Sequence, residues 1–285
     1  MNMTTTNLHA THLLKKGVSF LLFFILETMV FAIITFSPYL LRNTLLTFHT
    51  ILTAALLIVA MVLRTSENGK PYWPVFYVYF VAGAAVLIST LFSDDLLRWL
   101  NQSVTTPQGI AMAKFSESLL RVIPILVLMP LMGFNWHSMY LKTGKVRLWL
   151  PIAVAAWVVF PAIAYFSLSS SQTGVLDKLL PLWPWILLFV LSNGFMEELL
   201  YRGIFLKQYE HFLGKGLSVI LTALVFTLMH TQVTYAAQMI QFLVIVLVLS
   251  LIWGILIQKS DSLWGAVLFH AAGDCLVIFS AFASI

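Results

Sequence analysis

The dominant pattern along the chain is a series of apolar runs, each of roughly 20 residues, separated by short polar segments. A helix that crosses the hydrocarbon core of a bilayer needs about 20 apolar residues, so each run predicts one transmembrane helix. The fourth run is the weakest because Lys114, Glu117 and Arg121 lie within it, and eight spans are the alternative to nine. The pattern predicts an all-α polytopic transmembrane helix bundle with spans at residues 17–41, 44–63, 73–92, 113–133, 148–168, 182–203, 216–233, 237–257 and 262–283.

Lysine and arginine residues predict the orientation of this bundle, because cytoplasmic loops of membrane proteins are enriched in both. With a cytoplasmic N-terminus, the external segments hold Arg42, Arg98 and Lys178. The cytoplasmic segments then hold a larger set, namely Lys15, Lys16, Arg64, Lys70, Lys142, Lys145, Arg147, Lys207, Lys215 and Lys259. We therefore expect a cytoplasmic N-terminus and an external C-terminus.

Composition excludes a soluble globular protein. Hydrophobic residues make up 60% of the chain and charged residues 9%, and the mean hydropathy is +0.94. The net charge of +5 comes from basic residues scattered through short loops, so it does not indicate a nucleic-acid partner. Phe and Trp are expected to face lipid and to form interfacial belts, and the single cysteine, Cys275, to be a small buried hydrophobe. We expect a multi-pass integral membrane protein with lipid as a partner, in the plasma membrane if the host is bacterial.

Three ionisable residues interrupt the sixth apolar run, and they are the first candidates for function. Glu197, Glu198 and Arg202 lie in a segment otherwise apolar enough to cross a membrane, where each charge costs about 2.5–3.5 kcal/mol on insertion scales. Glu198 and Arg202 are four residues apart, so they share a helix face and can pair. Glu197 points about 100° away around the helix axis and can act elsewhere. Interhelical ion pairing without catalysis is the alternative interpretation.

Two histidines in later apolar runs are the expected partners of these acids. His230 ends the seventh run, and His270 lies four residues before Asp274 on one helix face. With Glu197 they supply a carboxylate base, imidazoles that can orient or share a proton, and polar groups to bind water. Glu197, His230 and His270 are equally a two-histidine, one-carboxylate zinc set. Spacing does not choose between these interpretations.

Three motifs in order resemble those of the CPBP family, which comprises the CAAX endopeptidases and the bacteriocin-processing or self-immunity membrane proteins also called Abi proteins. They are Glu-Glu-x-x-x-Arg at 197–202, Phe-x-x-x-His at 226–230 and His-x-x-x-Asp at 270–274. The resemblance covers residues 182–285, which we interpret as a catalytic core of about four spans. Residues 1–181 form an N-terminal transmembrane region of about five spans without an assignable motif.

The resemblance implies an intramembrane endopeptidase that cleaves a membrane-associated protein or peptide, with or without a lipid modification. It assigns roles to residues of the three motifs: Glu197 is the base for the attacking water, His230 its partner, His270 and Asp274 bind water or the developing oxyanion, and Glu198 with Arg202 is the supporting ion pair. The family carries the name metalloprotease, yet the resemblance favours water activated by glutamate without a required metal, and zinc is the alternative. The soluble zinc-protease pattern His-Glu-x-x-His is absent from the sequence.

Two other classes of function fit the same residues. A non-catalytic immunity or scaffolding relative would keep the motifs as packing polar groups. A proton-coupled transporter would use Glu197, His230 and His270 as a relay, although no inverted repeat is evident in the sequence.

Overall fold

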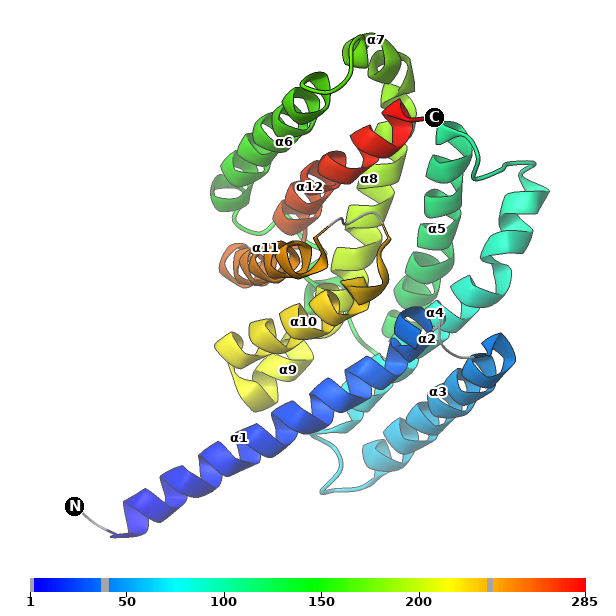
Figure 1. Cartoon of the computed structure of the whole chain (residues 1–285). Coiled ribbons are helices and arrows are strands. Elements are labelled where there is room, and N and C mark those ends of the chain that lie inside the picture. Colours follow the sequence, from blue (N-terminus) through cyan, green and yellow to red (C-terminus); the bar gives the residue numbers. More distant parts are fainter. Residues whose placement is uncertain (1–2, 37–40, 235–237) are drawn as a thin grey trace. The chain divides into compact units, whose positions relative to one another are not determined.

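The computed structural model describes residues 3–36, 41–234 and 238–285, and this part of the chain contains helices and no strand (Figure 1). Its elements, in which η marks a short 3-10 or π-helical turn, are α1 (Met3–Val30), α2 (Ala32–Phe36), α3 (Arg42–Thr65), α4 (Trp73–Trp99), α5 (Pro107–Leu131), η1 (Trp136–Met139), α6 (Val146–Ser169), α7 (Val175–Leu179), η2 (Leu180–Leu182), α8 (Trp183–Glu198), η3 (Leu199–Gly203), α9 (Leu206–Leu213), α10 (Lys215–Met229), η4 (His230–Gln232), α11 (Met239–Ser260) and α12 (Trp264–Ala283). The predicted all-α class is confirmed.

Six helical segments among the described residues are long and apolar enough to cross a membrane: α3, α4, α6, the run Val175–Leu213, α11 and α12. The chain is therefore an integral membrane protein by its helices. The nine-span count and the cytoplasmic N-terminus stay predictions. The remaining predicted spans fall on α1, which contains Lys15, Lys16 and Glu27, on the charged α5, and on α10, whose 15 residues are fewer than a full crossing requires.

The boundaries of the first predicted span differ from the observed ones, and the sixth predicted span contains a change of helix type. The first helix begins at Met3, well before the predicted residue 17, and gives way to α2 after Val30, while residues 37–40 of that span lie outside the described residues. In the sixth, the α-helix ends at Glu198 and continues as the π-helical turn η3, in which Ile204 N donates to Leu199 O at 3.1 Å. Isolated π turns often mark functional segments of a helix.

The chain divides into two compact units. The first comprises residues 1–83 and 205–251, where α1 packs on α9 and α10. Glu27 is fully buried there and accepts a hydrogen bond from Tyr209 Oη at 2.7 Å, and Tyr209 Oη lies 2.9 Å from Tyr79 Oη. Gly214, at φ +78°, connects α9 to α10 in a conformation that favours glycine.

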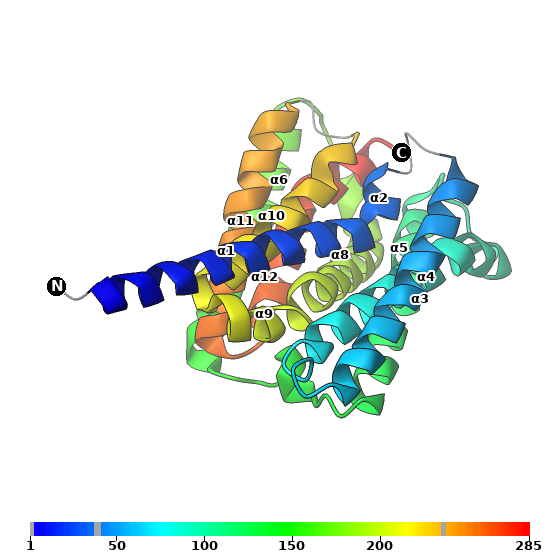
Figure 2. The same cartoon turned by 90° about the horizontal axis from the view of Figure 1, so that it is seen from below.

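The second unit comprises residues 84–204 and 252–285 and is built around α8 and α12. α12 packs against both α6 and α8, and α8 packs against α5 (Figures 1 and 2). The apolar core between these helices includes Ile186, Val190, Ala271 and Phe279, and Cys275 is buried in it as predicted. This packing holds the polar residues of α8 and α12 in one unit.

A glycine sets the close approach of α8 and α12. A Cβ added at Gly194 would lie 3.0 Å from Val267 O and 3.1 Å from Ala271 N, so a larger residue would require the two backbones to move apart by a few tenths of an ångström. Small residues commonly have this role between membrane helices. The approach places the polar residues near Gly194 on α8 next to those of α12.

Candidate active site

The acid pair lies where α8 passes into the π turn η3. Glu198 and Arg202 are both fully buried, and Arg202 Nη1 donates to Glu198 Oε1 at 2.8 Å. The predicted pairing of these two residues is therefore present. A charge buried this completely needs a partner, because the desolvation cost of an unpaired ion is several kcal/mol.

His270 connects α12 to both glutamates. Its Nδ1 lies 2.8 Å from Glu198 Oε1, which indicates an Nδ1–H donor, since a carboxylate paired with arginine accepts. Its Nε2 lies 3.4 Å from Glu197 Oε2 and 3.6 Å from Asp274 Oδ1. One imidazole edge is thus held by Glu198, and the other faces the two remaining carboxylates.

Asn193 belongs to the same cluster, although no motif drew attention to it. It lies one turn before Glu197 on α8, and its Nδ2 donates to Asp274 Oδ2 at 3.0 Å. Its side chain is 7% exposed. The signal that could have revealed it is its spacing, because an amide four residues before Glu197 in an apolar helix shares the face of that acid.

Trp253 of α11 covers the cluster with its indole. The ring stacks on the His270 imidazole with centroids 4.2 Å apart and planes 7° from parallel, and Arg202 Cζ lies 5.3 Å from the indole centroid. The expectation that the tryptophans face lipid or the membrane interface is wrong for this residue, which is 4% exposed. Sequence alone carried no signal for it, because one Trp in an apolar run resembles the others.

A row of charges on α5 faces the acids of α8. Lys114 Nζ lies 2.7 Å from one oxygen of Glu117, and Arg121 Nη2 lies 2.5 Å from the other. Arg121 is also bound to Ser89 Oγ at 2.9 Å. Arg121 Nη1 lies 3.8 Å from Met196 Sδ, so the charges of α5 lie against α8 next to Glu197. The three α5 charges thus add a net positive charge beside a cluster rich in carboxylates.

His230 lies in the other unit, so its position relative to Glu197 is not part of the described geometry. Its Nδ1 lies 2.8 Å from Phe226 O, and its ring centroid lies 4.4 Å from that of Phe226. The predicted role of His230 as partner of Glu197 remains a prediction.

The metal set also remains a prediction, since it includes His230. Within the described ranges, no group of three or more His, Cys, Asp or Glu side chains has an arrangement suited to a metal ion. We therefore derive no chemical step through zinc.

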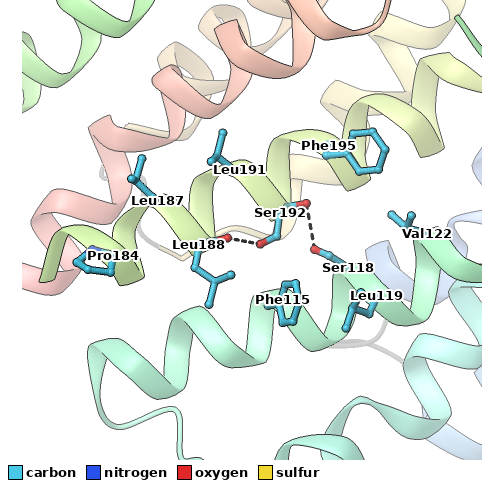
Figure 3. A pocket seen from close by; sticks show the side chains of 10 residues that line it. All are labelled: Phe115, Ser118, Leu119, Val122, Pro184, Leu187, Leu188, Leu191, Ser192 and Phe195. Atoms are coloured by element: carbon cyan, nitrogen blue, oxygen red, sulfur yellow. Dashed lines mark hydrogen bonds between the residues drawn. The ribbon is translucent and has the colours of Figure 1, made fainter. Parts of the chain in front are cut away.

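An apolar groove of about 490 Å³ runs between α5 and α8 (Figure 3). Ten side chains line it: Phe115, Ser118, Leu119, Val122, Pro184, Leu187, Leu188, Leu191, Ser192 and Phe195. Ser118 Oγ donates to Ser192 O at 3.1 Å and Ser192 Oγ to Leu188 O at 2.5 Å, so both hydroxyls bond to backbone. The groove therefore offers an apolar surface beside the helix that carries Asn193 and Glu197.

Comparison with known proteins shows which family this segment is similar to. Residues 179–276 match the family described as Type II CAAX prenyl endopeptidase Rce1-like, which confirms the resemblance predicted from the three motifs. The chain is also similar to the UPF0177 protein YbdI of Lactococcus lactis subsp. lactis (strain IL1403), with 33% identity over 76 residues. That alignment covers 27% of this chain and 40% of the length of the relative. No solved structure gives a significant match.

Proposed function

Because residues 179–276 are similar to Rce1-like CAAX prenyl endopeptidases, we propose that the protein is a membrane-embedded endopeptidase that uses water activated by Glu197. Its substrate would be a membrane-associated protein or peptide. A prenylated C-terminal motif, a bacteriocin leader, a pheromone precursor and a membrane-protein segment are alternative substrates. We further propose that residues 182–285 are the catalytic core.

The proposal rests on the surroundings of the Glu197 carboxylate. Its Oε2 is buried and makes no hydrogen bond with the described residues, yet it lies 3.4 Å from His270 Nε2. Glu198 Oε2 and Asn193 Oδ1 are likewise buried acceptors without a hydrogen bond in the described part of the chain. Three such acceptors together need donors, because each buried unsatisfied polar group costs about 1–3 kcal/mol. In a hydrolase, the attacking water and the N–H groups of a bound peptide would supply these donors.

In the proposed reaction, Glu197 accepts a proton from a water molecule as the water oxygen attacks the carbonyl carbon of the scissile bond. The carbonyl oxygen becomes the oxyanion of a tetrahedral intermediate. His270 Nε2, with Asp274 beside it, is suited to bind that oxyanion or the water, provided that Nε2 carries a proton. The C–N bond then breaks as the amine nitrogen receives the proton held by Glu197, and the products are a carboxylic acid and an amine. Transfer of the acid proton to the amine then gives a carboxylate and an ammonium group.

The remaining residues hold this geometry in the proposal. Glu198 accepts from both Arg202 and His270, so it fixes the imidazole whose other edge faces Glu197. Second partners of this kind fix the tautomer and ring direction of a functional histidine. His230 is retained as the proposed partner of the Glu197-bound water.

The direct test is Glu197→Gln, which is nearly isosteric and removes the base. The purified protein in lipid nanodiscs would be assayed with an internally quenched farnesylated CAAX peptide, and membrane peptidomes of cells with wild-type or variant protein would reveal other substrates. We expect cleavage to be lost and the melting temperature to change little. Glu67→Gln, at an exposed position, is the matched control and should retain wild-type cleavage.

A non-catalytic scaffolding or immunity role is the second candidate, and the fully buried Glu198–Arg202 pair favours it, since such a pair can hold a bundle together. The same Glu197→Gln variant separates the two. A scaffold would keep its cellular function in this variant, whereas an endopeptidase would lose it. Substrate uptake by proteoliposomes without peptide cleavage would instead indicate a transporter.

A further inference from the structure

The Asn193 amide has a donor end and an acceptor end, and only the donor end is hydrogen-bonded within the described part of the chain. Its Nδ2 donates to Asp274 Oδ2 at 3.0 Å. Its Oδ1 is buried and has no hydrogen bond with the described residues. Since most buried polar atoms in proteins are hydrogen-bonded, an exception of this kind needs a ligand or a water to explain it.

The direction of the amide follows from Asp274. An ionised carboxylate has only acceptors, so the NH₂ end of Asn193 must face Asp274 and the Oδ1 end must point elsewhere. A flipped amide would bring two oxygens together. The orientation of Oδ1 is therefore set by the charge on its neighbour.

The same hydrogen bond fixes Asp274. With Oδ2 held by Asn193, the other oxygen, Oδ1, lies 3.6 Å from His270 Nε2. Without Asn193, rotation of the carboxylate would change which oxygen faces the imidazole. Asn193 thus sets, through Asp274, which carboxylate oxygen lies near His270 Nε2, the ring atom that Glu197 also faces.

A peptide substrate is suited to Asn193 Oδ1. A peptide bond exposed for hydrolysis is no longer inside a regular helix, so its backbone N–H groups lose their intrahelical acceptors. In a membrane each such donor must be satisfied by protein or water. Asn193 lies four residues before Glu197 on one helix face, so an acceptor there is one helical turn from the base.

We propose that Asn193 is a positioning residue that fixes Asp274 through Nδ2 and binds a backbone N–H of the substrate peptide through Oδ1. The proposal rests on the proposed endopeptidase function. It adds a residue outside the three motifs and assigns the substrate's peptide backbone, rather than a side chain, as its ligand.

The test exchanges the side chains of Asn193 and Asp274. Asn193→Asp places two carboxylates against each other and should lower kcat/KM roughly 100-fold, a loss comparable with removal of one preorganised donor. The double variant Asn193→Asp with Asp274→Asn restores one donor and one acceptor in reversed order and leaves an acceptor toward the substrate. We expect it to recover at least about tenfold in kcat/KM over Asn193→Asp and to recover the melting temperature, as coupled residues do in a double-mutant cycle.

Asn193→Ala tests the substrate contact by raising KM, and Asn43→Asp at an exposed position is the control for the chemical change. The probe is the quenched farnesylated peptide used for Glu197→Gln. Suppose that the wild-type protein cleaves the peptide and that this cleavage depends on Glu197. If the exchanged pair then shows no recovery, or if KM is unchanged in Asn193→Ala, the role of Asn193 alone is overturned. If the wild-type protein shows no Glu197-dependent cleavage of this peptide and no Glu197-dependent product appears in the membrane peptidomes, the proposed function is overturned instead.

Discussion

His270 Nδ1 lies 2.8 Å from Glu198 Oε1, and the same oxygen accepts from Arg202 Nη1 at 2.8 Å. One carboxylate oxygen thus joins α12 to the π turn after α8. The two adjacent glutamates therefore have different surroundings. Glu198 is hydrogen-bonded to Arg202 and His270, whereas Glu197 has a buried oxygen without a hydrogen bond in the described part of the chain, beside the opposite edge of the imidazole.

Glu198→Gln should destabilise the protein strongly. It removes the negative charge from the fully buried ion pair with the Arg202 guanidinium, and loss of one member of a buried pair costs about 3–5 kcal/mol. The measurement is thermal unfolding in nanodiscs, with exposed Glu67→Gln as control. A melting temperature equal to that of the control would contradict the structural role of Glu198.

Gly194→Ala should lower stability by about 1–3 kcal/mol, the typical cost of overpacking. Its Cβ would meet backbone atoms of Val267 and Ala271, which cannot move aside as a side-chain end can. Gly273→Ala on α12 is the matched control, because a Cβ there meets nothing within 4 Å. Equal melting temperatures for the two variants would show that α8 and α12 do not approach through Gly194.

Trp253→Leu should reduce activity more than Trp253→Phe does. The indole stacks on His270, and an aromatic pair is worth about 0.5–1.5 kcal/mol beyond burial, so we expect a difference of roughly 2- to 10-fold in kcat/KM. Phenylalanine keeps an aromatic face for the imidazole, whereas leucine does not. Trp99→Leu, at a position that is 80% exposed, should behave like wild type. Equal activity of the Leu and Phe variants would count against orientation of His270 by stacking.

Removal of metal should leave cleavage intact. The proposed base is Glu197, and His270 Nδ1 is already bonded to Glu198, so the reaction is written with these side chains alone. The measurement is the rate of peptide cleavage after dialysis against EDTA or 1,10-phenanthroline. A rate that disappears on chelation and returns with added zinc would replace this mechanism by one that uses the predicted zinc set.

The sequence determined the helical class and the membrane environment, because runs of apolar residues have few stable structures other than spanning helices. It also determined the Glu198–Arg202 pair and the shared face of His270 and Asp274, since these depend on spacing within one helix. These are local properties. They need no knowledge of which helix packs on which.

Tertiary structure alone decided which side chains meet between helices. Asn193 reaches Asp274, and Trp253 covers His270, only because close packing of α8 and α12 and the placement of α11 bring residues distant in sequence together. The approach at Gly194 likewise depends on a neighbouring backbone rather than on local preference. Periodicity describes the face of one helix, whereas the partner of that face is set by packing.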